Sequence, residues 1–127
     1  MIVFIKMQIE TILKNYDNTG IIKGKIIHVY KGRQRRIAAE LGDQVLIASQ
    51  KNDYSKLQKR KMTRAIIIKT RKNKKRQNGH YITFKNAGFL TLSEKNVFKA
   101  FRIRGPVTNE MRYNKTEGIT TTAKTLL

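Results

Sequence analysis

The chain has 127 residues, of which 28 are Lys or Arg and 8 are Asp or Glu, so its formal net charge is +20 at pH 7. That length fits one domain with a real hydrophobic core. The charge lies far beyond the magnitude of about 2–8 that suits a small soluble domain, and such self-repulsion favours a partner rich in negative charge. The sequence has no cysteine, which excludes disulfides, thiolate zinc sites and cysteine nucleophiles.

Short apolar or alternating runs separated by turn signals predict a mainly β fold, either a small closed barrel or a sandwich. The predicted strands are residues 7–13, 21–30, 44–49, 65–68, 81–84, 89–92 and 100–104. In the second of them, alternation should send Ile27 and Val29 to one face. The other face should carry Ile26, His28 and Tyr30. Residues 50–64 lack a clear period and predict a long loop. We expect a single domain over residues 1–127, with no separate linker or repeat.

The N-terminal and C-terminal ends carry weaker signals. Residues 1–5 are apolar but too few for a signal sequence or a membrane span, so we expect no membrane partner. In residues 100–104, alternation should turn Phe101 and Ile103 inward and leave two guanidinium groups outside. Thr108 is a candidate N-cap for a short helix.

A basic hairpin is the most distinctive predicted feature. An apolar β-branched run at residues 65–68 leads into residues 69–76, of which six are Lys or Arg, and an Asn-Gly turn then precedes another alternating run. Between Asp53 and Glu94 there are twelve Lys and Arg residues and no acidic one. A region that needed cations only for solubility would interleave carboxylates, so this composition predicts binding to a polyanion.

Four basic segments supply the candidate phosphate contacts, because guanidinium groups pair with phosphate in a bidentate manner and lysines add mobile charge. The candidates are Arg33, Arg35, Arg36, Lys59, Arg60, Lys61, Lys69, Arg71, Lys72, Lys74, Lys75, Arg76, Arg102 and Arg104. If about 8 phosphates were neutralised, the logarithm of affinity would fall against the logarithm of salt with a slope of about −6 to −7.

Other chemistry finds less support. Aromatic residues such as Tyr81, Phe84, Phe89 and Phe101 lie in strand patterns that favour core packing over base stacking. The carboxylates are scattered singly and the two histidines are far apart, so we expect no enzymatic activity, no metal site, no cofactor and no small-molecule substrate. One alternative that this charge leaves open is a free single-strand nucleic-acid binder, which should show outward-facing aromatics on one sheet face.

Several motifs resemble a known family. Residues 102–112, Arg-Ile-Arg-Gly-Pro-Val-Thr-Asn-Glu-Met-Arg, are similar to the Arg-Ile-Phe-Gly-Pro-Val-x-x-Glu-Leu-Arg signature of ribosomal large-subunit protein fourteen, the universal L-fourteen family. Residues 17–20 resemble that family's Asp-Asn-Ser-Gly, and residues 64–70 resemble its Lys-Ala-Val-Val-Val-Arg-Thr. The similarity is collinear from about residue 7 to the end of the chain.

The resemblance implies a five- to six-stranded β-barrel of the oligonucleotide-binding type, with a short helical segment at residues 106–127 and an N-terminal extension at residues 1–6. It implies a structural role in which the protein binds large-subunit rRNA, touches small-subunit rRNA at intersubunit bridges, and neighbours the L-nineteen and L-three families. The Ile-, Lys- and Asn-rich composition and the absence of a presequence indicate a mitochondrially encoded member, with a plastid or bacterial ribosome as the alternative.

Overall fold

The computed structural model describes residues 11–18, 20–30, 39, 41–52, 62–71, 74–75, 78–93, 98, 102–108, 119 and 127. Its strands are β1 (Ile12–Asn15), β2 (Ile21–Val29), β3 (Gln44–Asn52), β4 (Met62–Lys69), β5 (Lys74–Lys75), β6 (Tyr81–Ile82) and β7 (Gly88–Leu92). Five of them close a barrel in the order β1-β2-β3-β4-β7, and β5 and β6 form a separate two-stranded ribbon. The predicted small β-barrel is therefore confirmed.

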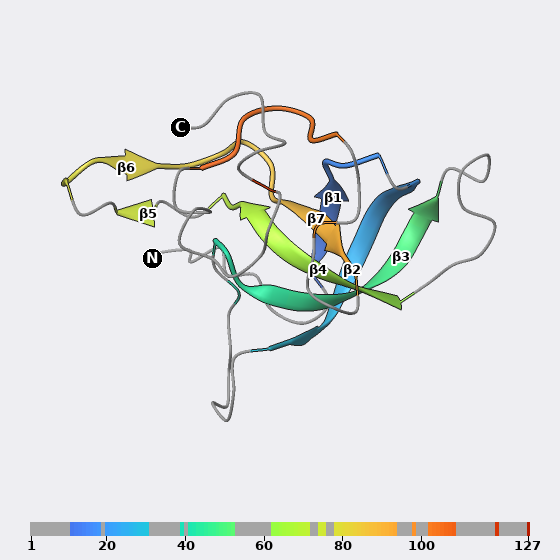
Figure 1. Cartoon of the computed structure of the whole chain (residues 1–127). Helices are drawn as coiled ribbons and strands as arrows, with labels where there is room; N and C mark the ends of the chain where they lie inside the picture. Colours follow the sequence, from blue (N-terminus) through green and yellow to red (C-terminus); the bar gives the residue numbers. More distant parts are fainter. Residues whose placement is uncertain are drawn as a thin grey trace.

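The barrel closes where the first strand meets the last. β1 pairs antiparallel with β2 and parallel with β7, through Lys14↔Gly88 and Asn15↔Phe89. All other barrel pairings are antiparallel. Figure 1 shows the strongly curved β2, β3 and β4 wrapping around this junction. Closure leaves these strands without a free edge at which another chain could pair.

A bulge in β2 overturns the predicted alternation. Its pairing with β3 shifts register between Ile26 and His28, where two residues of β2 stand opposite one of β3. Ile26 and Val29 are therefore both buried, whereas Ile27 is only half-buried and His28 is exposed. The prediction that Ile26 and Val29 face opposite ways was wrong because strict alternation assumes an unbroken ladder.

Two hydrophobic clusters lie on opposite sides of β4 and β7. The barrel interior contains Leu13, Ile21, Ile26, Val29, Ala39, Val45, Ile47, Ala65, Ile67 and Phe89. The outer cluster contains Ile66, Ile68, Leu90, Leu92, Phe98, Ile103, Val107 and Ile119. Because both faces of β4 are covered, its apolar residues form a continuous run instead of alternating with polar ones. The second cluster fastens the segment around Ile103 to the outside of the barrel.

The basic hairpin is built differently from the prediction. β4 pairs with β3 and β7, not with the strand that follows the basic run. The chain instead folds back on itself beyond the barrel, where the Phe84 amide donates to the Thr70 carbonyl and the Thr83 hydroxyl donates to the Arg71 carbonyl. The β5–β6 ribbon then extends away from the barrel (Figure 1). We call residues 70–84 the basic arm.

Other boundaries also differ from the prediction. The expected loop at residues 50–64 is wrong at both ends, since β3 continues to Asn52 and β4 starts at Met62. The expected strand at residues 100–104 is a single bridge, Asp17↔Ile103, within the described residues. Thr108 is fully buried and its hydroxyl has no hydrogen-bond partner among the described residues, so the predicted N-cap is not seen. The N-terminal extension and most of the C-terminal segment lie outside the described residues.

Candidate nucleic-acid interface

The turn that follows β1 is held by a buried carboxylate. Asp17 Oδ2 accepts hydrogen bonds from the amide and the hydroxyl of Thr91, both at 2.7 Å. Its Oδ1 accepts from Asn15 Nδ2 at 2.7 Å, and the same amide group donates to the Ile21 carbonyl at 2.8 Å. A buried charge is tolerated when its oxygens are satisfied in this way. The sequence pattern predicted no role for Asp17, because the acidic residues are scattered. In the structure its carboxylate holds the turn after β1 in place.

A segment bearing two arginines docks on that turn. The Arg104 amide donates to the Tyr16 carbonyl at 2.7 Å, and the Arg102 amide donates to Asn18 Oδ1 at 3.3 Å. Between them, Ile103 is buried in the outer cluster. The predicted alternation is confirmed here, because Ile103 points inward while both arginine side chains are exposed. We call Arg102 and Arg104 the guanidinium pair.

Lys69 lies beneath this segment. The prediction that it belongs to an exposed loop was wrong. It is the last residue of β4 and only 6% of its surface is exposed. Its ammonium nitrogen lies 3.8 Å from the centroid of the Tyr16 ring and 5.7 Å from that of Phe84. Burial, and secondarily the charge of Lys14, lower the pKa of Lys69 below 10.5. Gly105, at φ +79°, leaves room for this ammonium group, since a β-carbon there would stand 2.8 Å from it.

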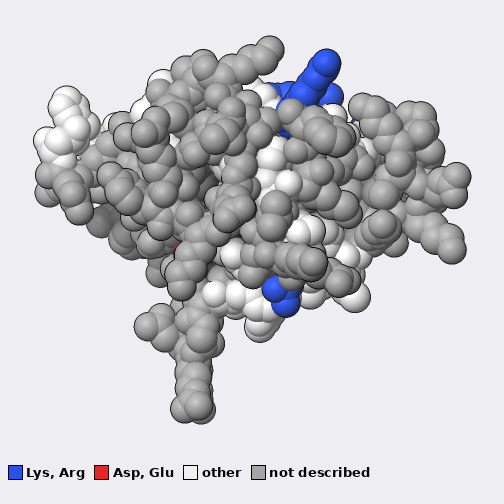
Figure 2. All heavy atoms as spheres, viewed as in Figure 1, with Lys and Arg blue, Asp and Glu red and all other residues white. Residues whose placement is uncertain are grey.

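The remaining candidates fall into two groups. Arg71 is exposed at the base of the basic arm, and Lys74 and Lys75 form β5 in the arm itself. Outside the described residues lie Arg33, Arg35, Arg36, Lys59, Arg60, Lys61, Lys72 and Arg76. In Figure 2, blue Lys and Arg atoms emerge at the upper edge, near the orange segment of Figure 1, and again below the centre of the view. Among the described candidates, Lys69 lies close to the guanidinium pair, because a β-carbon on Gly105, the residue after Arg104, would stand 2.8 Å from its Nζ.

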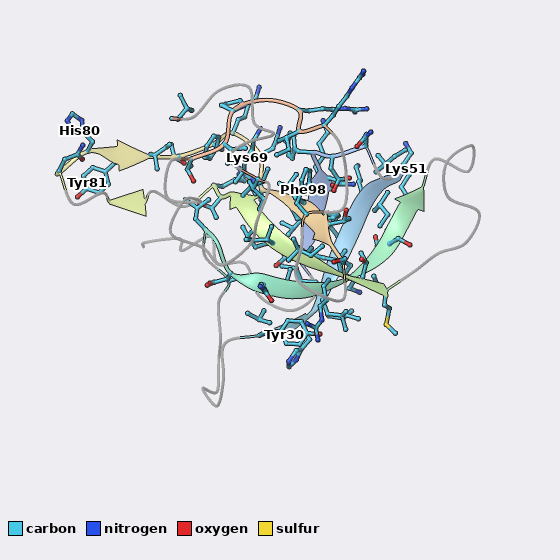
Figure 3. The ribbon with its side chains drawn as sticks, viewed as in Figure 1. Tyr30, Lys51, Lys69, His80, Tyr81 and Phe98 are labelled. Atoms are coloured by element: carbon cyan, nitrogen blue, oxygen red, sulfur yellow. The ribbon has the colours of Figure 1, made fainter. Side chains whose placement is uncertain are left out.

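The aromatic residues divide between core and surface. Phe89 is fully buried, as predicted, and Phe84 is half-buried beside Lys69. Tyr81 is 65% exposed, so its predicted core position was wrong, because β6 belongs to the projecting arm and has no core beneath it. Tyr30 is also exposed, and Figure 3 shows it at the lower edge of the molecule, far from Tyr81 at the arm. Phe101 lies outside the described residues.

The described part of the chain contains neither a metal-binding cluster nor a membrane-spanning helix. No group of three or more His, Asp or Glu side chains there is placed to hold a metal ion. Nor do the described residues include a helix of the length and apolar character required to cross a membrane.

These features define a class of protein: a small closed β-barrel that presents cations on a segment and an arm fastened to its outside. The family model described as Ribosomal protein L14p/L23e matches residues 6–127. The chain belongs to this family, and the resemblance in its motifs is confirmed. It is accordingly a structural protein of the large ribosomal subunit and not an enzyme.

Proposed function

We propose that the chain binds and stabilises large-subunit rRNA by clamping phosphates between the guanidinium pair and the basic arm. The observation that carries this proposal is the guanidinium pair itself. Both side chains are exposed while their backbone is tied to the barrel through Tyr16 and Asn18. Arginine groups held on a fixed backbone lose less conformational freedom on meeting a phosphate than mobile ones do.

The charge distribution supports the same partner. Folded rRNA packs phosphates close together, and a protein with a formal charge of +20 lowers their mutual repulsion while releasing condensed counterions. Backbone contacts of this kind fix position and register without reading sequence. The remaining candidate residues of the basic arm and of the segments at residues 33–36 and 59–61 would extend the contact.

Sedimentation tests this proposal directly. We expect a tagged copy of the chain, expressed in its native cell, to migrate with the large-subunit peak in a magnesium-containing sucrose gradient. Lowering magnesium enough to unfold the subunit should release it. Recovery of the protein at the top of the gradient in magnesium would support the alternative of a free single-strand binder.

Finer assignments follow from the family resemblance and the composition. We propose contacts with small-subunit rRNA at an intersubunit bridge, contacts with the L-nineteen and L-three families, and a mitochondrial ribosome as the location. The Ile-, Lys- and Asn-rich composition supports the last of these. Crosslinking of gradient-purified ribosomes from separated mitochondria, plastids and cytosol tests all three. Detection only in cytosolic or plastid ribosomes would contradict the location.

A further inference from the structure

Three side chains, two from strands and one from the residue after β2, meet on the outer surface of the barrel. Tyr30 directly follows β2, and its ring centroid lies 4.8 Å from that of His28 with an interplanar angle of 77°. The guanidinium carbon of Arg64, on β4, lies 5.3 Å from the Tyr30 centroid. All three side chains are exposed. We call them the aromatic platform.

Strand register explains why they meet. His28 pairs with Leu46 of β3, and Leu46 pairs in turn with Arg64 of β4. His28 and Arg64 therefore lie in one row across the sheet, with Leu46 between them. Directly paired residues point to the same face, and Tyr30 joins them because it stands two residues after His28. The bulge between Ile26 and His28 is what turns His28 outward. Without it, the alternation would bury His28 and expose Val29.

The platform is separate from the guanidinium pair and from the basic arm. Figure 3 places Tyr30 at the lower edge of the barrel, below β2 and β3, whereas Lys69 lies toward the upper side and His80 and Tyr81 lie out on the arm. The proposed phosphate clamp therefore leaves this aromatic surface unexplained.

The chemistry of the platform favours an RNA base over a neighbouring protein. The strands β2, β3 and β4 contain no Asp or Glu. Their cations are Lys23, Lys25, Lys51, Arg64 and Lys69. Arg64 lies in the platform itself, whereas Lys51 and Lys69 lie toward the upper side of Figure 3. These strands therefore offer a basic protein no carboxylate to pair with, whereas a nucleotide brings its own phosphate. Aromatic rings and guanidinium planes are the groups on which unpaired bases stack.

We propose that the aromatic platform stacks one unpaired base of rRNA, forming a second contact on a side of the barrel distinct from the phosphate clamp. This inference rests on the proposed rRNA binding and adds a single-stranded nucleotide as the chemical target. Stacking on Tyr30 is insensitive to base identity because every base has a flat face. Arg64 adds attraction for the adjoining phosphate.

Fluorescence with a modified RNA tests the platform. The full chain is titrated with a short single-stranded RNA carrying one 2-aminopurine, and with the same RNA annealed to its complement. We expect quenching only in the single strand, and single-strand affinity about tenfold above the duplex affinity, which is the order expected from stacking one base. Tyr30→Leu should abolish both the quenching and the single-strand preference, while duplex affinity stays the same.

Two further variants and a structural control complete the design. Tyr30→Phe keeps the stacking face and should behave as wild type, and His28→Ala should reduce quenching because it removes the ring that holds Tyr30 in place. Circular dichroism confirms that each variant folds. Two results would contradict base stacking on the platform without touching the phosphate clamp. One is full 2-aminopurine quenching in the Tyr30→Leu variant. The other is loss of quenching in Tyr81→Leu but not in Tyr30→Leu. If the wild type bound neither RNA form, both proposals would fail.

Discussion

The ammonium nitrogen of Lys69 lies 3.8 Å from the centroid of the Tyr16 ring, in a place where almost no water reaches it. The negative face of the ring replaces part of the lost hydration. Lys14 approaches the same ring at 5.8 Å, so two cations share one aromatic surface. Through Tyr16, whose carbonyl accepts from the Arg104 amide, this contact also bears on the position of the guanidinium pair.

The pH dependence of stability should report on Lys69. Burial, with a smaller contribution from Lys14, lowers its pKa below 10.5 in the folded protein, so the unfolded chain binds this proton more tightly. The free energy of unfolding should therefore rise with pH between the lowered pKa and 10.5, and this residue should contribute no slope below that window. Urea denaturation of the wild type and of Lys69→Met across this range measures the contribution.

The difference between the two proteins is the quantity of interest, because other lysines and tyrosines titrate in the same range. We expect that difference to be flat near neutral pH and to grow as Lys69 loses its proton. A parallel pH dependence of wild type and Lys69→Met would show that the ammonium group is as well stabilised in the fold as in water.

Gly105 and Gly79 form a matched pair for a second prediction. Both have positive φ, at +79° and +87°, but only Gly105 faces a neighbour, since nothing lies within 4 Å of a β-carbon built on Gly79. Gly79→Ala should cost about 1 kcal/mol, the price of the left-handed backbone alone. Gly105→Ala should cost more, because its methyl group would displace Lys69 Nζ from its buried place against the Tyr16 ring. Thermal or urea unfolding gives both values.

A double variant isolates the cause. In a Lys69→Ala background, the excess cost of Gly105→Ala over Gly79→Ala should disappear. If Gly105→Ala still cost more than Gly79→Ala in that background, the extra cost would come from the backbone around Gly105 and not from Lys69.

Asp17 offers a third prediction. Asp17→Asn replaces an acceptor oxygen with a donor amide facing either Thr91 or Asn15, so one buried hydrogen bond becomes a clash of donors. We expect a loss of about 1–3 kcal/mol in unfolding free energy. Asn18→Ala is the control, since its bond to Arg102 is solvent-exposed and should contribute less. Equal losses from the two variants would contradict the role assigned to the buried carboxylate.

The contribution of the guanidinium pair should be measurable in the salt dependence of rRNA affinity. Replacing Arg102 and Arg104 together by Gln should reduce the log–log salt slope of rRNA binding by about 2, or one unit for each lost phosphate contact. The matched double change to Lys should keep the slope but weaken affinity, because Lys cannot form the bidentate contact. Filter binding of an rRNA transcript over a range of salt measures both. Stability should not change, as both side chains are exposed.

Tight packing inside the barrel gives a fifth prediction. A β-carbon on Gly24 would overlap Ile47 Cγ2 and press on the Phe89 ring. Gly24→Ala should therefore destabilise the fold by about 1–3 kcal/mol. Combining it with Ile47→Ala should cost less than the sum of the two single changes, which calorimetry can verify. Additive costs would mean that the overlap is relieved by backbone movement instead.

The strands that local composition determines were predictable. The β-branched residues 65–68 lie in β4, and Phe89 lies in the interior, because continuous apolar runs favour strands covered on both faces. The outward direction of Arg102 and Arg104 also followed from simple alternation around Ile103.

The features that could not be predicted depend on contacts between residues that are far apart in the sequence. Nothing within the basic run marks Lys69 as a lysine buried beneath Gly105, because the residues that cover it come from another part of the chain. Asp17 acquires its role only when the fold brings Thr91, 74 positions away, within hydrogen-bond distance. The bulge in β2 likewise reflects its pairing with β3, and it alone turns His28 outward to form the aromatic platform with Tyr30.

The parallel pairing of β1 with β7 has a consequence for the order of folding. β2, β3 and β4 follow one another along the chain and pair with their neighbours in sequence, whereas β1 must also wait for a strand made much later. Contacts of such large sequence separation form slowly, since a long loop has to close first. The guanidinium pair docks on the turn at Tyr16, directly after β1. A nascent or partly folded chain therefore lacks its positioned arginines until synthesis has passed Arg104 and the barrel has closed.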